Sequence, residues 1–130
     1  MTDHSLALQS AIVALLKGND IAGDRIYVLP NAASTFPYVS MGPADATEDD
    51  AECIDGVEAT QQIDVWSRSG SNAEAMLIAG QIRRLIHRQD IPITAATIAE
   101  IEVRSVRLFR DPDGKTTHVV IEVRAIIETE

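Results

Sequence analysis

Seven acidic side chains, with no basic one among them, lie within sixteen residues near the middle of the 130-residue chain. They occupy Pro43 to Glu58 and are Asp45, Glu48, Asp49, Asp50, Glu52, Asp55 and Glu58. Carboxylates are typical ligands of Ca²⁺, but the run from Asp49 to Gly56 lacks the early glycine and late glutamate of a calcium loop. A carboxylate hydrolase needs two acids that face each other across a pocket, which neighbouring acids in a loop do not indicate. The segment therefore predicts neither a metal site nor a catalytic pair.

The other residue types that could do chemistry are scattered. His4, His87 and His118 lie far apart and show no metal-ligand spacing. The only cysteine, Cys53, lies among carboxylates, which disfavour the thiolate form that a catalytic cysteine needs. The seven glycines form no phosphate-binding pattern. We therefore expect a protein that is not an enzyme and holds no metal or cofactor. A lone cysteine cannot form an intrachain disulfide, which indicates a reducing compartment.

The net charge of -9 is concentrated in this acidic segment, because the remaining residues together carry only -2. An acidic chain does not attract nucleic acid through its overall field. The longest apolar run has six residues, whereas a membrane-spanning helix needs about twenty. Several arginines lie in the C-terminal third, among them Arg104, Arg107 and Arg110. A chain with an acidic segment and a basic region suits head-to-tail contact between copies, and the alternative is a solvated acidic loop.

Periodic apolar positions predict two helices. Between Ser5 and Lys17, leucine and isoleucine residues recur every three or four positions, as on one face of a helix. Ser71 to Glu74 has the pattern of a capping box and predicts the start of the second helix. The side chains expected to face the core from the second helix are Ala75, Ile78, Ala79, Ile82, Leu85 and Ile86.

Alternating or β-branched residues predict the strands. We expect short strands at Arg25–Leu29 and Tyr38–Met41, with the acidic segment following as a loop. Longer strands are expected at the ranges Val57–Ser67, Ile98–Phe109 and Thr116–Ile127. Asp111 to Gly114 suits a tight turn with a glycine bulge. Trp66 lies on the polar side of its strand, which indicates either a second covered surface or a strand end packed under a loop.

The order helix, short strand, hairpin, helix, hairpin predicts an α+β fold, with two helices packed on one face of a mostly antiparallel sheet that has two long hairpins. Residues 1–130 are expected to form one domain. Hairpin arms of this length would span about 35 to 40 Å at ~3.3 Å per residue, which equals or exceeds the width of such a domain. Such arms either curl or pair with another subunit.

The whole chain resembles the tail completion, or tail terminator, proteins of long-tailed bacteriophages, prophages and gene transfer agents. The order and spacing of several short motifs carry this resemblance. The motifs are Leu6-Ala7-Leu8-Gln9-Ser10-Ala11-Ile12, Arg25-Ile26-Tyr27, Phe36-Pro37-Tyr38-Val39 before Gly42, Asp55-Gly56, Gln62-Ile63-Asp64-Val65-Trp66-Ser67, and Phe109-Arg110-Asp111-Pro112-Asp113-Gly114.

The resemblance implies a structural subunit without catalytic residues. Similar proteins form a six-membered ring that caps the head-proximal end of the tail tube, stops its polymerisation and offers a surface for joining the head. The implied partners are other copies of the chain, the tail tube protein, head-tail connector proteins, and DNA that passes through the channel without sequence-specific binding. The implied location is the virion tail or neck, and the host cytoplasm before assembly. The rival functions are another neck component, such as an adaptor or stopper, and a cytoplasmic α+β ligand-binding module.

The candidate interface or channel residues are Asp45, Glu48, Asp49, Asp50, Glu52, Asp55, Arg104, Arg107 and Arg110. Under the resemblance, the acidic segment faces either a basic surface of the neighbouring subunit or the channel. In a channel, carboxylates would repel DNA phosphates and keep the duplex from sticking.

Overall fold

The computed structural model describes residues 4–30, 34–48 and 56–129. Its elements in chain order are α1 (His4–Lys17), the 3₁₀ helix η1 (Ile21–Asp24), β1 (Ile26–Tyr27), β2 (Tyr38–Glu48), β3 (Gly56–Ser67), α2 (Ala73–Ile86), β4 (Ala96–Arg110) and β5 (Thr117–Thr129). This order confirms the predicted α+β fold with two helices and two long hairpins. None of the described helices is long and apolar enough to cross a membrane.

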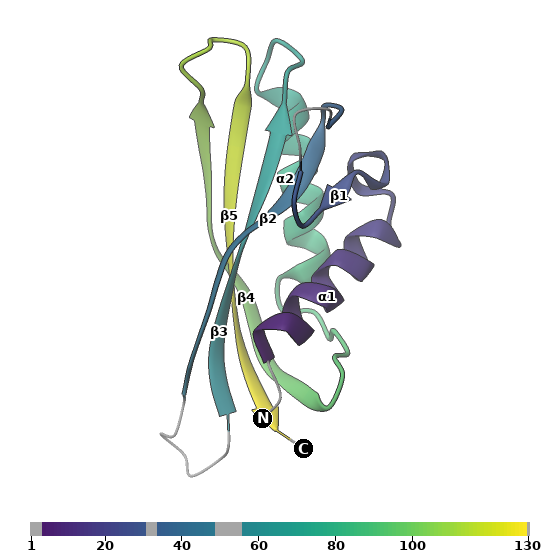
Figure 1. Cartoon of the computed structure of the whole chain (residues 1–130), viewed down its shortest axis with the longest axis vertical. Coiled ribbons are helices and arrows are strands. Elements are labelled where there is room, and N and C mark those ends of the chain that lie inside the picture. The colour runs from purple at the N-terminus through teal and green to yellow at the C-terminus, as the bar shows by residue number, and fades with distance from the viewer. Residues whose placement is uncertain (1–3, 31–33, 49–55, 130) are drawn as a thin grey trace.

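The five strands form one twisted sheet in the order β1-β2-β3-β5-β4, and the long strands run along the longest dimension of the molecule (Figure 1). All neighbours are antiparallel except β1, which runs parallel to β2. The centre of the sheet joins the two hairpins, because β3 pairs with β5 from Gly56↔Glu128 to Ser67↔Thr117. The outermost strands are therefore the short β1 on one side and the 15-residue β4 on the other.

Both helices pack on one face of this sheet (Figure 1). As predicted, α1 buries Leu8, Ile12 and Leu16, and α2 buries Ala75, Ile78, Ala79, Ile82 and Ile86. Leu15 on α1 and Leu85 on α2 are only half-buried. The sheet contributes alternate side chains to the same core, for example Ile63, Val65, Ile121 and Val123. Each buried aliphatic side chain of this size stabilises the fold by about 1.5 to 3 kcal/mol. Burial of these side chains therefore holds both helices against this face of the sheet.

The sequence prediction placed the end of β2 too early. The strand continues beyond Met41 to Glu48, so Asp45 and Glu48 lie on a strand and not in a loop. Pro43 cannot donate a backbone hydrogen bond, but an irregularity in the pairing between Met41 and Ala44 accommodates it. The other predicted acids, Asp49, Asp50, Glu52 and Asp55, lie outside the described residues together with Cys53.

The capping box at the start of α2 is also only partly right. The Ser71 hydroxyl oxygen accepts a hydrogen bond from the Ala73 N–H at 3.3 Å, but the Glu74 carboxylate does not turn back to the helix start. Instead it accepts a hydrogen bond of 2.7 Å from the Ser67 hydroxyl. Ser67 is fully buried at the end of β3, so its hydroxyl needs this acceptor.

The predicted turn between β4 and β5 is confirmed. The Gly114 N–H donates to the Asp111 carbonyl at 3.0 Å, and Gly114 has a φ of 71°, a conformation that favours glycine. The Asp113 carboxylate accepts hydrogen bonds from the N–H groups of Lys115 and Thr116 and from the Thr116 hydroxyl. These bonds, led by the one from Lys115, lower the pKa of Asp113 to about 2.

Candidate channel and interface surfaces

The face of the sheet opposite the helices is strongly acidic toward the end where β2 finishes. Residues that pair directly across a sheet share a face, and the register places Asp45, Thr60, Arg124 and Glu102 in one row across four strands. We call this side the open face. Its acids in this half are Asp45 on β2, Glu58 on β3, Glu100 and Glu102 on β4, and Glu122 and Glu128 on β5.

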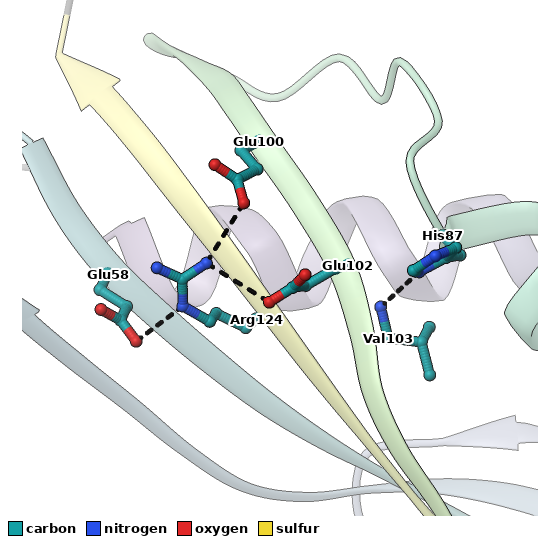
Figure 2. A network of polar contacts seen from close by, with 6 residues as sticks. All are labelled: Glu58, His87, Glu100, Glu102, Val103 and Arg124. Atoms are coloured by element: carbon teal, nitrogen blue, oxygen red, sulfur yellow. Dashed lines mark hydrogen bonds and ion pairs between the residues drawn. The ribbon is translucent and has the colours of Figure 1, made fainter.

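Arg124 lies at the centre of this acidic half and contacts three of its carboxylates (Figure 2). Its Nε donates to Glu58 Oε1 at 2.8 Å, and its Nη1 lies 3.5 Å from both Glu100 and Glu102. The hydrogen bond to Glu58 is the main reason that the pKa of Arg124 is raised. The Arg124 side chain is only 22% exposed and its guanidinium lies among carboxylates, so it presents little positive charge to an outside anion.

The other half of the open face carries aromatic side chains. The rings of Trp66 and His118 are stacked with centroids 3.8 Å apart, and Tyr38 stacks on the other side of Trp66 at 6.2 Å. Partial burial is the main cause of a raised pKa at Tyr38. Trp66 Nε1 donates to the Ser40 hydroxyl oxygen at 3.0 Å. Trp66 is thus half-buried by side chains of the neighbouring strands, which differs from both readings of the sequence.

One of these rings, that of His118, also contacts a buried acid. His118 Nε2 lies 2.7 Å from Asp64 Oδ1, which also accepts a hydrogen bond from Gln62 at 2.9 Å. Asp64 is buried, although it sits on the open face. A Cβ added at Gly42 would lie 2.6 Å from Asp64 Oδ2, so any larger residue here would displace the Asp64 carboxylate. Gly42 therefore leaves space for the Asp64 carboxylate.

The three predicted arginines all lie exposed on β4, but they do not form one patch. Arg107 lies on the open face, where its guanidinium is 5.2 Å from the centre of the Phe109 ring. Arg110 donates to Asn72 Oδ1 at 2.8 Å, at the start of α2. Arg104 occupies the irregularity between Val103 and Ser105. His87 Nδ1 accepts a hydrogen bond from the Val103 N–H at 3.0 Å and so attaches this region to the end of α2 (Figure 2).

Within one subunit, the described candidate acids do not meet these arginines. Asp45 is in the row of Glu102, whereas Arg107 is in the row of Asp64 and Ser40. Those rows are four residues apart on β3, or about 13 Å at ~3.3 Å per residue. Glu48 pairs with Val57 and therefore lies on the side of the sheet opposite to Asp45.

An apolar groove between α2 and β4 was not predicted from the sequence. It has a volume of about 370 Å³ and is lined by Met76, Ala79, Gly80, Arg83, Val106, Leu108 and Val119. Met76, Val106 and Leu108 remain 38 to 59% exposed. The available signal was the alternation of Val106 and Leu108 on a strand that has no second neighbour, but strand order could not be read from the sequence.

The described residues contain no group of three or more histidine, cysteine or acidic side chains placed to hold a metal ion. The arrangement on the open face is instead a surface of fixed charge, with Arg124 shared among carboxylates. Such a surface attracts or repels other charged molecules through its field.

Comparison with known proteins supports a structural role. The family described as "Tail completion protein gp17" matches residues 5–128. A chain from the virion of a native gene transfer agent particle matches the structure with a TM-score of 0.84 and 20% identity, covering 94% of this chain and 95% of that chain. The gp17 protein of bacteriophage SPP1 matches with a TM-score of 0.62 and 22% identity, covering 94% and 89%. No curated protein matches the chain.

At these identities the two solved structures show a shared fold, and the family match decides the family because it covers nearly the whole chain. It confirms the resemblance carried by the sequence motifs. The chain belongs to the tail completion protein gp17 family, and it is a structural protein of a phage-type virion tail and not an enzyme.

Proposed function

We propose that six copies of the chain form a closed ring at the head-proximal end of the tail tube. The ring ends tube polymerisation and provides the surface to which the head is joined. Its partners are other copies of the chain, the tail tube protein and the head-tail connector proteins. Residues 1–130 act as one domain in this ring. Membership of the tail completion family supports a role at this end of the tail.

The observation that carries the proposal is the contrast between the two faces of the sheet. One face is covered by α1 and α2, and the other carries six acids in one half. A ring with the strands along its axis and the helices outside would present the open face to the channel. Carboxylates there would repel DNA phosphates, so that the duplex passes without sequence-specific binding.

The register decides which residues of a neighbouring subunit lie level with Asp45. In a ring whose axis follows the strands, residues of neighbouring subunits meet at equal height. Asp45 would then lie level with Glu102 of the neighbouring subunit and not with its Arg107. Contact between the like charges of Asp45 and Glu102 costs free energy, whereas Arg104, one to two positions from that row on β4, would attract Asp45. The channel location of Asp45 therefore rests on its place on the open face.

Electron microscopy of particles that lack the protein tests the position in the tail. Over-long or uncapped tubes are expected if the ring ends polymerisation. Tails of normal length that are detached from heads would instead identify an adaptor or stopper, and tails that are normal in both respects would contradict any role in completion.

Charge reversal on the open face tests the channel. We expect Asp45→Lys with Glu122→Lys to leave particle number unchanged and to reduce DNA delivery, because the new charges attract phosphates. Asp90→Lys, at an exposed position between α2 and β4, is the matched control. Equal DNA delivery by the double variant and the control would refute a channel-facing open face.

A further inference from the structure

The groove between α2 and β4 lies at one edge of the sheet. There β4 pairs with β5 on its inner side, and no described strand pairs with its outer side. Its volume of about 370 Å³ equals that of roughly a dozen water molecules at about 30 Å³ each, which is ample for aliphatic side chains. Apolar side chains that remain exposed beside an unpaired strand are typical of a protein interface. The groove therefore needs an occupant.

The opposite edge of the sheet, at β1, carries an exposed apolar segment. Leu29 is 88% exposed and Val28 is 48% exposed, and both directly follow β1. β1 and β4 are four strand spacings apart, or about 19 Å at ~4.8 Å per spacing. The segment therefore cannot reach the groove of its own subunit, although a second copy can supply it.

The register places this segment and the groove at the same height along the strands. Ile26, Val39, Val65, Val119 and Leu108 form one row that crosses all five strands. Rotation about an axis changes no height along that axis, so a closed ring requires its two contacting surfaces to be level. Val28 and Leu29 directly follow Tyr27, the last paired residue of β1, and so begin next to this row, while Val106 lies two positions from Leu108 on β4.

The charges beside the two surfaces are complementary. Arg83 lines the groove, Asp20 precedes η1, and Asp24 is the last residue of η1, shortly before β1. All three are exposed and make no ion pair within the described part of the chain. Association would bring opposite charges together at the rim of an apolar contact, which is the usual arrangement of a specific interface.

We propose that Val28 and Leu29 of one subunit insert into the groove between α2 and β4 of the next subunit. This interface rests on the proposed ring and specifies which residues close it. The contact is heterologous, since the two surfaces differ, and repeated copies therefore extend in one rotational direction until the ring closes.

Cysteine cross-linking in purified particles tests the contact. In a Cys53→Ser background, Leu29→Cys is combined with Gly80→Cys, whose added Cβ meets no atom within 4 Å. We expect a short thiol cross-linker to give a ladder of covalent oligomers that ends at the ring size. The control combines Leu29→Cys with Ala99→Cys, an exposed position on the same β4 about 20 Å farther along the strand, and we expect it to give no ladder.

A ladder from the control pair, no ladder from the test pair, or a cross-link to a different protein would each overturn the interface. The proposed function is judged separately by tail length. If particles with the cysteine variants have tails of normal length, and particles without the protein do not, the proposed function stands and only the interface fails. As a second measurement, Leu29→Ala should weaken association between copies by roughly 10- to 100-fold without lowering the melting temperature. The control Leu77→Ala, which is 68% exposed on α2 and does not line the groove, should leave association unchanged.

Discussion

Replacing Gln61 by leucine tests whether the irregularity in β2 depends on one buried amide. Gln61 lies on the helix-covered face of β3 and is fully buried. Its Nε2 donates to the carbonyls of Gly42 at 3.1 Å and Gln62 at 2.8 Å, and its Oε1 accepts from Gln9 Nε2 at 3.2 Å. The backbone between Met41 and Ala44 leaves the regular ladder, so a side chain supplies the partner that the Gly42 carbonyl would otherwise lack.

The expected magnitude follows from these three hydrogen bonds. Leucine is close in size to glutamine, so the variant adds little cavity cost, but the Gly42 carbonyl loses its donor. An unsatisfied buried group costs about 1 to 3 kcal/mol, and a hydrogen bond to a partly exposed partner such as Gln9 contributes about 0.5 to 1.5 kcal/mol. Added apolar burial offsets part of this loss. We expect Gln61→Leu to lower the free energy of unfolding by about 2 to 3 kcal/mol, out of about 5 to 15 kcal/mol for a typical domain.

Urea denaturation followed by circular dichroism measures this change. Gln9→Ala is the matched control, because it removes one of the three bonds and leaves the Gly42 carbonyl satisfied. The control leaves the buried Gln61 Oε1 without its donor, so we expect it to cost about 1 to 2 kcal/mol, less than Gln61→Leu. If Gln61→Leu is as stable as the natural chain, or no less stable than Gln9→Ala, then the amide does not hold the irregularity and the reasoning is wrong.

Two further predictions concern charged groups. Arg124→Gln removes the guanidinium between Glu58, Glu100 and Glu102. Because Arg124 is partly exposed, we expect the free energy of unfolding to fall by about 1 kcal/mol or less, and by less at high salt. Thermal unfolding at two ionic strengths measures this change. Asp113→Ala should lower the melting temperature at neutral pH. The pKa of Asp113 in the folded state is about 2, below its ordinary value of 3.8, so its contribution is present above that value and is lost as the pH falls toward 2. The melting temperatures of variant and natural chain should therefore converge near pH 2, and a difference that persists there would contradict this origin.

The sequence predicted the elements whose pattern is local. Helical spacing located α1 and α2 and most of their buried side chains, because each helix buries one face. Strict alternation located β3 and β5 in the same way. The turn at Asp111 to Gly114 was recognisable because glycine occupies the left-handed position.

The misplaced end of β2 and the overlooked Gln61 have one cause. Pro43 signals the end of a strand when only local rules are applied, yet β3 supplies a side-chain donor that lets the strand continue past it. Gln61 interrupts an apolar face, and its role becomes visible only when its partner at Gly42 is known. Long-range pairing thus decided the one boundary that mattered for Asp45 and Glu48.

The candidate surfaces were only partly predictable for the same reason. The acidic segment is contiguous in the sequence, whereas the open face collects acids from four strands, including Glu100, Glu102 and Glu122. The insertion of β5 between β3 and β4 brings these strands together, and nothing in the local pattern of charges indicates it. The groove likewise depends on β4 being outermost. Strand order, which follows from the whole fold, therefore determines both surfaces.

Arg124 has a further role in the acidic half of the open face. A lone arginine in a channel would bind a phosphate and slow the passing duplex. Here Glu58 accepts its Nε–H, and Glu100 and Glu102 lie beside its Nη1, so the arginine stays charged but its donors are directed at carboxylates of the same subunit. The arginine also reduces repulsion among these three carboxylates, which would otherwise oppose folding. The same residue thus allows the face to be densely acidic, and in the proposed channel it would keep its own charge from DNA.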